Sequence, residues 1–287
     1  CKNLPQTERL FMKILIDNYS DYSNSQSLYL NEGFKNFGHE SHVFDVASNS
    51  IFDVCDTINP DILIISANRI TKGVIEYLQQ SNLKLIINID NLDLDNTKQL
   101  TSFLKEAKVG VAFLFTSEES FPKNVDGFNV VKVYHAADVN QIESLHFNYN
   151  VGKAIIIDKT HENIGYEGSF HVIGIGDKVK KENVDIFLPS ISLRSLFPKY
   201  NEIIFKDLQK INQTFLNAIC SGVPTYYDNE DSSKIQETLN KMLKEEFNIN
   251  YRNENKITDF KNIASVVKEN HTGNNRAKTI LSQIKGA

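Results

Sequence analysis

The feature that most constrains the fold is a regular alternation of short apolar runs with longer segments whose hydrophobic residues recur at helical spacing. Strands that alternate with helices of about a dozen residues are typical of βαβ units. Such units predict an α/β protein with a parallel sheet covered by helices on both faces. In the first half of the chain the predicted strands are 12–18, 41–46, 59–67, 83–90, 109–117 and 128–139.

The second half repeats this pattern in a reduced form. The crossover over 159–169 has no helical pattern, so the second domain is expected to be abbreviated. The predicted strands are 153–158, 170–176, 184–189 and 201–207, and the predicted helices are 208–221, 231–247, 257–269 and 276–284.

A chain of 287 residues is long enough for two domains of ordinary size. We predict an N-terminal Rossmann-like domain over 12–140 and a C-terminal Rossmann-like domain over 141–287, which face each other across a cleft. Residues 1–11 are expected to be an extension or a cloning remnant. The polar stretch 138–152 is the predicted hinge.

Composition favours a globular protein that is soluble in water, because 41% of the residues are hydrophobic and 23% are charged. No run reaches the ~20 apolar residues of a membrane span, and no secretory leader is recognisable. Three scattered cysteines are too few for a disulfide framework, which favours a reducing, cytoplasmic location. The net charge of −5 argues against nucleic acid as a major ligand, and the lysines of 256–285 are typical of a solvated helix face.

Polar and charged residues follow most of the predicted strands. In open parallel sheets ligands bind outside the carboxyl ends of the strands, so these residues are candidates for a site. Amides, hydroxyls and carboxylates suit a sugar, whereas a phosphate needs a cation or a helix N-terminus. The first-half candidates are Asn18, Tyr19, Ser20, Asp21, Asn68, Arg69, Asp90 and Asn91, and the second-half candidates are Lys159, His161, Gly174, Gln209, Asn212, Gln213, Thr214 and Asp228.

Several other ligand classes lack their motifs in this sequence. The glycines of 174–177 are not followed by the third glycine and the helix of a dinucleotide fingerprint. The chain contains no phosphate-binding loop of the G-x-x-x-x-G-K type and no G-x-S-x-G elbow. The seven histidines are not spaced as metal ligands, so no metal is expected.

Two segments resemble those of a known family. "TSEESFPKNVDGFNVVKVYHAADV" (Thr116 to Val139) resembles the segment that leads into the second domain of nucleotide-sugar glycosyltransferases with the GT-B fold. "INQTFLNAICSGVPTYYDNED" (Ile211 to Asp231) resembles their donor-binding helix, and Gly222 and Pro224 are expected to shape its exit. The nearest variety is the spore-maturation-type subgroup of the group 1-like glycosyltransferases.

The resemblance implies a nucleotide-diphosphate sugar as co-substrate on the second domain, an acceptor on the first, and no tightly bound cofactor or metal. The helix N-terminus near Ile211 would stabilise the diphosphate, and Lys159 or His161 would add positive charge. Asp21 or Asp90 would act as the base, and the reaction would be retaining by analogy.

The chain departs from the family at two positions. Gln209 and Asn217 stand where the family often has two glutamates, so the hydrogen-bonding shape is kept and the negative charge is lost. Three functions therefore stay open: a glycosyltransferase, a non-catalytic nucleotide or glycan binder, and a sugar-nucleotide epimerase or phosphorylase. Many Asn, Ile and Lys residues and no Trp suit a phage or low-GC bacterial gene, so the acceptor could be a surface glycan, a protein or a hydroxymethylated DNA base.

Overall fold

The computed structural model describes residues 11–18, 26–44, 50–137, 152–159, 161, 164–175, 179–180, 184–187, 196–229, 233–244, 246–253 and 259–284. The chain divides into two compact units. Unit 1 comprises residues 1–19, 30–133 and 277–287, and unit 2 comprises residues 20–29 and 134–276. The predicted hinge and the boundary at 140/141 lie outside the described residues. Nowhere in the described ranges is there a helix with the length and apolarity needed to cross a membrane.

Unit 1 is built on a sheet of seven strands in the order β2-β1-β3-β4-β5-β7-β6. The first six strands in this order are parallel, as the sequence pattern predicts. They are β1 (Lys13–Asp17), β2 (Glu40–Phe44), β3 (Ile62–Ser66), β4 (Lys84–Asn88), β5 (Val111–Thr116) and β7 (Phe128–Lys132), and the helices are α1 (Gln26–Asn36), α2 (Ile51–Ile58), α3 (Lys72–Gln80), α4 (Leu94–Glu106) and α9 (Gly273–Ile284). The first residues of α1 and α9, 26–29 and 273–276, belong to unit 2.

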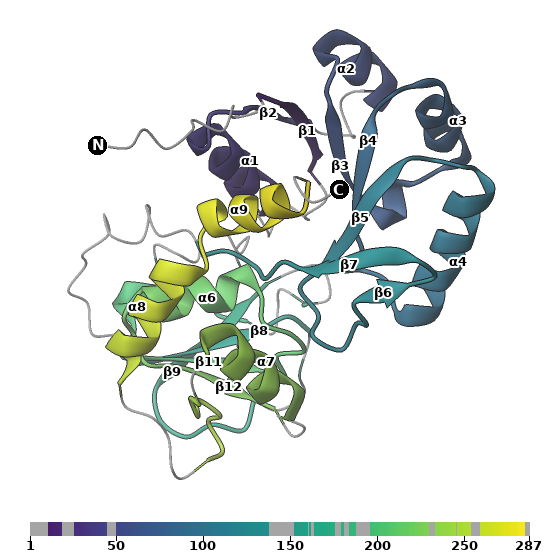
Figure 1. Cartoon of the computed structure of the whole chain (residues 1–287). Coiled ribbons are helices and arrows are strands. Elements are labelled where there is room, and N and C mark those ends of the chain that lie inside the picture. The colour runs from purple at the N-terminus through teal and green to yellow at the C-terminus, as the bar shows by residue number, and fades with distance from the viewer. Residues whose placement is uncertain are drawn as a thin grey trace, which may run out of the picture. The chain divides into compact units, whose positions relative to one another are not determined.

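The sheet of unit 1 has helices on both faces (Figure 1). Alternate strand residues point to opposite faces: Leu15 belongs to the core under α2, α3 and α4, whereas Ile14 and Ile16 belong to the core with α1 and α9. Each such side chain contributes about 1.5–3 kcal/mol on full burial.

The last strands of unit 1 differ from the prediction. The sixth predicted strand, 128–139, is shorter in the structure, because β7 ends at Lys132. A two-residue strand, β6 (Asn124–Val125), pairs antiparallel with β7. The turn between them is Asp126-Gly127, with φ angles of 48° and 86°. Asp-Gly is a strong signal for a two-residue hairpin, so the sequence carried this information.

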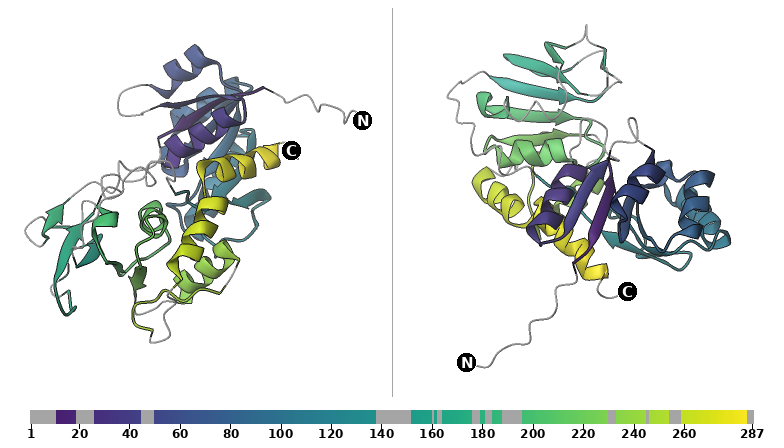
Figure 2. Two further views of the ribbon diagram at one scale, coloured as in Figure 1. Left: turned by 90° about the vertical axis from the view of Figure 1, so that its left-hand side faces the viewer. Right: turned by 90° about the horizontal axis from the view of Figure 1, so that it is seen from above.

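Unit 2 contains a parallel sheet of five strands in the order β10-β9-β8-β11-β12. Helices α6, α7 and α8 pack on one face of this sheet (Figure 2). The strands are β8 (Lys153–Ile157), β9 (Phe170–Gly174), β10 (Ile186–Phe187), β11 (Glu202–Lys206) and β12 (Thr225–Asp228), and the helices are α6 (Gln213–Cys220), α7 (Ser233–Leu243) and α8 (Phe260–Asn270).

The other face of this sheet has a smaller core. Ile155, Ile157 and Ile204 pack there against Val179 and residues of the 164–170 segment. The residues of 159–169 that the structure describes contain no helix. Over these described residues the structure agrees with the crossover that the sequence predicts.

Candidate functional site

The topological switch point of the unit 2 sheet lies between β8 and β11, because β9 and β10 extend the sheet on one side and β12 extends it on the other. Ligands of open α/β sheets bind at such a point, outside the carboxyl ends of the strands. Lys159 and His161 follow β8, and Asp207 follows β11. The Lys159 Nζ lies 3.4 Å from Asp207 Oδ2, and the His161 Nδ1 lies 3.7 Å from the same oxygen. The structure thus brings the two predicted donor-side residues to one carboxylate.

The two bases differ in charge. Lys159 is half exposed, so its ammonium can contact a ligand while it remains paired with Asp207. Burial lowers the pKa of His161 below its ordinary value of 6.5. The carboxylate of Asp207 acts in the opposite direction, but Lys206 and Lys159 add to the lowering, and the pKa stays below 6.5. The imidazole is therefore neutral at neutral pH, which disfavours the positive charge predicted for His161. Its Nε2 is buried and has no hydrogen-bond partner among the described residues.

Asp207 was not predicted as a site residue. Its φ of 52° is in the left-handed region, which few residues other than Gly, Asn and Asp adopt. Its backbone N–H donates to the Asp228 carbonyl at 2.7 Å, and its own carbonyl accepts from the Gln209 Nε2 at 2.9 Å. The turn after β11 is therefore fixed on both sides. Gln209 is exposed there, and Gly174 lies at the end of β9 beside Ile157 of β8.

Helix α6 begins at Gln213, later than the predicted start at 208. The reason is Asn212, whose side-chain oxygen accepts from the Phe215 N–H at 2.9 Å and thereby caps the helix. The predicted exit is confirmed, since Gly222 has a φ of 77°. The first N–H groups of a helix lack intrahelical partners and carry the positive end of its dipole, so this end can accept an anion.

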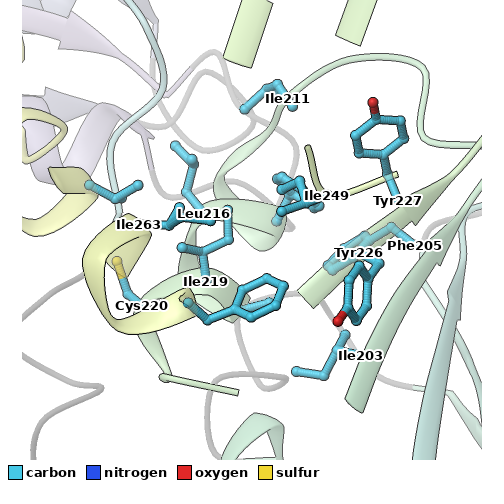
Figure 3. Close-up of a cluster of buried hydrophobic side chains, with 14 of the residues drawn as sticks. Ile203, Phe205, Ile211, Leu216, Ile219, Cys220, Tyr226, Tyr227, Ile249 and Ile263 are labelled. Carbon is cyan, nitrogen blue, oxygen red and sulfur yellow. The ribbon is translucent and has the colours of Figure 1, made fainter. Parts of the chain in front are cut away.

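The predicted polar residues of α6 are buried. Gln213, Thr214 and Asn217 are each no more than 5% exposed. The Gln213 Oε1 has no hydrogen-bond partner among the residues that the structure describes. The apolar side chains of the helix, Leu216 and Ile219 among them, lie between the strands and α8 (Figure 3). The helix is therefore held rigidly on the sheet.

Asp228 lies at the end of β12 and has partners within unit 2. Its two carboxylate oxygens accept hydrogen bonds from Arg252 and from the Tyr166 hydroxyl, and its part in framing a phosphorylated sugar stays a prediction. Burial and the hydrogen bond to Asp228 both raise the pKa of Tyr166, so this phenol stays protonated. Asp228 thus ties loops together on the second unit.

Asp90, a predicted base on unit 1, is the centre of a hydrogen-bond network. Its Oδ1 accepts from the Thr116 hydroxyl at 2.9 Å, the Ser117 N–H at 2.6 Å and the Ser117 hydroxyl at 3.0 Å. Its Oδ2 accepts from the Asn88 amide at 3.2 Å. These contacts join the ends of β4 and β5, which gives the carboxylate a structural role; its role as a base stays a prediction.

The switch point of the unit 1 sheet lies between β1 and β3. Asp17, which ends β1 and is fully buried, lies 4.0 Å from the half-exposed Arg69 after β3. Arg69 was predicted from the sequence and Asp17 was not, although a carboxylate as the last residue of a strand is a usable signal. Asn68 and Asn91 are exposed at the same edge, and Asn18 follows Asp17. Tyr19, Ser20 and Asp21 lie outside the described residues.

Comparisons with known proteins bear on the fold. No protein-family model and no curated protein matches the chain. Among solved structures, a glycosyltransferase from Rickettsia africae ESF-5 aligns with a TM-score of 0.58 at 11% identity, over 96% of this chain and 98% of that one. Sucrose-phosphate synthase from Thermosynechococcus elongatus aligns with a TM-score of 0.50 at 8% identity, over 95% and 94% of the two chains. The chain has the GT-B fold.

This result confirms the fold class that the two quoted segments predicted. The GT-B fold places two Rossmann-like units in one chain, in agreement with the two sheets. At these identities the likeness concerns the fold alone, and the spore-maturation-type subgroup stays a prediction.

Proposed function

We propose that the protein is a glycosyltransferase that moves a sugar from a nucleotide-diphosphate sugar to an acceptor hydroxyl. The observation that carries this proposal is the position of Lys159, paired with Asp207 at the switch point of the unit 2 sheet, on the edge where α6 begins. A half-exposed cation and a helix N-terminus on one sheet edge are groups that bind a diphosphate. The GT-B neighbours support the same class of reaction.

In the proposed reaction the bond between the anomeric carbon and the diphosphate oxygen breaks, and the diphosphate leaves with the bonding electrons. The Lys159 ammonium and the first N–H groups of α6 would stabilise the charge that develops on this leaving group. A new bond forms between the anomeric carbon and the acceptor oxygen, whose proton passes to a base. Asp21 and Asp90 are the proposed bases.

The sugar or ribose would be held by buried polar groups of α6. The Gln213 Oε1 is an acceptor with no described partner, so a ligand hydroxyl could donate to it. Gln209 is an exposed amide on the adjoining turn and could bind a hydroxyl as donor or acceptor. A retaining outcome is proposed from the family resemblance alone.

The proposal is tested by incubating the protein with a panel of nucleotide-diphosphate sugars and measuring release of the nucleotide diphosphate, with and without acceptors. The acceptors are an oligosaccharide mixture, a protein and DNA that contains hydroxymethylated bases. We expect release that requires one acceptor class. Conversion of the sugar without loss of the nucleotide would indicate an epimerase and would contradict the proposal.

A second candidate is a protein with the same fold that binds a nucleotide sugar or glycan without turnover. It is favoured by Gln209 and Asn217, because neither amide can stabilise a developing oxocarbenium ion as a glutamate can. Asn217 is buried inside α6, where a carboxylate would need a partner. Donor binding in calorimetry with no release for any acceptor would select this function.

A further inference from the structure

The first residue of α1, Gln26, anchors a buried polar cluster in unit 2. Its Nε2 donates to the Ala136 carbonyl at 3.0 Å, and its Oε1 accepts from the Ala136 N–H at 2.9 Å. Both side-chain ends are therefore fixed by one residue of the 133–137 segment. The Gln26 Oε1 also accepts a hydrogen bond from Arg276 Nη1, which places the guanidinium at the N-terminal end of α1.

Arg276 is a buried cation. It is 3% exposed, and its Nε and Nη2 have no hydrogen-bond partner among the described residues. Within the same part of the chain it forms no ion pair with a carboxylate. Burying a charge is costly unless it is paired. The chemistry of this position therefore calls for an anion.

The unpartnered atoms define how an anion would bind. Nε and Nη2 form the side of the guanidinium whose two N–H bonds are parallel, and this side pairs bidentately with two oxygens of a phosphate or carboxylate. Gln26 occupies the other side, at Nη1. The glutamine thus orients the guanidinium through Nη1 and does not use its bidentate side.

A second buried polar group without a described partner follows Gln26 directly in the chain. Ser27, in the first turn of α1, is fully buried, and its Oγ has no hydrogen-bond partner among the described residues. The first N–H groups of α1 lack intrahelical partners and carry the positive end of the helix dipole. A guanidinium, a hydroxyl and a helix N-terminus together suit the three terminal oxygens of a phosphate group.

Close packing of the two helices sets this geometry. A Cβ at Gly273, the first residue of α9, would lie 2.2 Å from the Tyr29 carbonyl oxygen, which is far below van der Waals contact. Only glycine allows this approach. Arg276 lies one helical turn after Gly273, and Gln26 lies about one turn before Tyr29. The contact between Gly273 and Tyr29 therefore brings the two polar side chains into register.

We propose that Arg276, Ser27 and the N-terminus of α1 form a binding site for a phosphate group, with Gln26 as the positioning residue. This site uses none of the residues proposed for the nucleotide-sugar donor, so it goes beyond the proposed function. Its ligand is a phosphate monoester or free phosphate, and binding would neutralise the buried guanidinium.

The experiment titrates inorganic phosphate against the purified chain and follows the unfolding temperature, with sodium chloride added to hold the ionic strength constant. We expect phosphate to raise the unfolding temperature of the wild type. In Arg276→Met the apparent phosphate affinity should fall at least tenfold, and in Ser27→Ala severalfold. Asn212→Asp, which alters α6 and not α1, should keep the response, and this separates the site from the donor site.

The stability of Arg276→Met relative to the wild type decides between this proposal and a purely structural role for Arg276. If Arg276 awaits an external anion, Arg276→Met is at least as stable as the wild type in phosphate-free buffer. A variant that is much less stable in every buffer would mean that a carboxylate of the chain itself neutralises Arg276, and would overturn the proposal. A phosphate response that is absent, or equal in the wild type and Ser27→Ala, would also overturn it. Acetate is titrated in parallel, and an equal response to acetate would assign the site to carboxylates instead.

Discussion

At the scale of single residues, the carboxylates that follow strands in this protein have two kinds of surroundings. Asp90 and Asp228 accept several hydrogen bonds each and hold loops. Asp207 has a half-exposed lysine beside it and a partly buried, neutral histidine. The sequence alone treats the three residues alike, because each is an aspartate after a predicted strand. Only their neighbours separate a structural carboxylate from one that can take part in binding.

Replacing Asp90 tests its structural role. Asp90→Asn keeps one acceptor oxygen but places an amide NH2 against another donor, so we expect a loss of about 1–2 kcal/mol in the free energy of unfolding. Urea denaturation measures it. Asp95→Asn, at a side chain 89% exposed, is the matched control and should change stability by less than about 0.5 kcal/mol. Unchanged stability in Asp90→Asn would contradict the structural role of these hydrogen bonds. The predicted role of Asp90 as a base would then be the one that remains.

Replacing Lys159 tests the donor-side cation. Lys159→Ala should weaken binding of the nucleotide diphosphate about five- to tenfold in calorimetry, because a half-exposed charge is partly screened by water and salt. Lys72→Ala is the matched control, since Lys72 forms an exposed ion pair with Glu76 in unit 1. Equal affinity in the wild type and Lys159→Ala would remove Lys159 from the site.

At the scale of elements, the sequence predicted the parallel strands and their helices well, because buried parallel strands are short apolar runs that stand out from their surroundings. The prediction was less accurate where a side chain or a turn sets the end of a helix or strand. Asn212 starts α6 at Gln213 by capping it, and Asp126-Gly127 turns the chain into an antiparallel strand. It also missed Asp17, Asp207 and Arg276, because contacts between distant segments give these residues their roles.

Helix α8 provides a test through pH. His271 follows its last residue, and the buried ring nitrogen Nε2 lies 2.9 Å from the Met242 carbonyl of α7. Burial lowers the pKa of His271 below 6.5, more than the hydrogen bond to Met242 raises it. The unfolded chain therefore binds a proton at a higher pH than the folded chain does. Stability is fully present above pH 6.5 and falls as the pH drops toward the folded-state pKa.

We expect the free energy of unfolding to decrease between pH 6.5 and 5 with a slope of up to about 1.4 kcal/mol per pH unit for this histidine. His271→Gln should reduce the slope, and His161, whose pKa is also lowered, should account for part of what remains. Urea denaturation at a series of pH values measures the free energy of unfolding of both proteins. His42→Gln, at a half-exposed histidine paired with Glu40 in unit 1, is the control. The same slope in the wild type and His271→Gln would show that His271 does not titrate in this way.

At the scale of the whole molecule, the two units have separate cores and separate switch points. A ligand that binds the donor site should stabilise the segments that hold it, by an amount that grows with ligand concentration. We expect a saturating nucleotide diphosphate to slow amide hydrogen exchange more over 153–159 and 203–216 than over 51–80. Exchange followed by mass spectrometry measures this. If amide exchange slows equally over 51–80, or slows only there, the nucleotide does not bind selectively to unit 2 and the predicted donor site is wrong.

The central claim is that the N-terminus of α6, on the same sheet edge as Lys159, binds the diphosphate of a nucleotide sugar. Asn212→Asp tests this claim most directly. Aspartate caps a helix as well as asparagine does, so urea denaturation should show a stability within about 0.5 kcal/mol of the wild type. The added negative charge at the N-terminus of α6 should lower the affinity for the nucleotide diphosphate about tenfold in calorimetry. If the affinity is unchanged while the stability is preserved, the diphosphate does not bind at α6 and the account is contradicted.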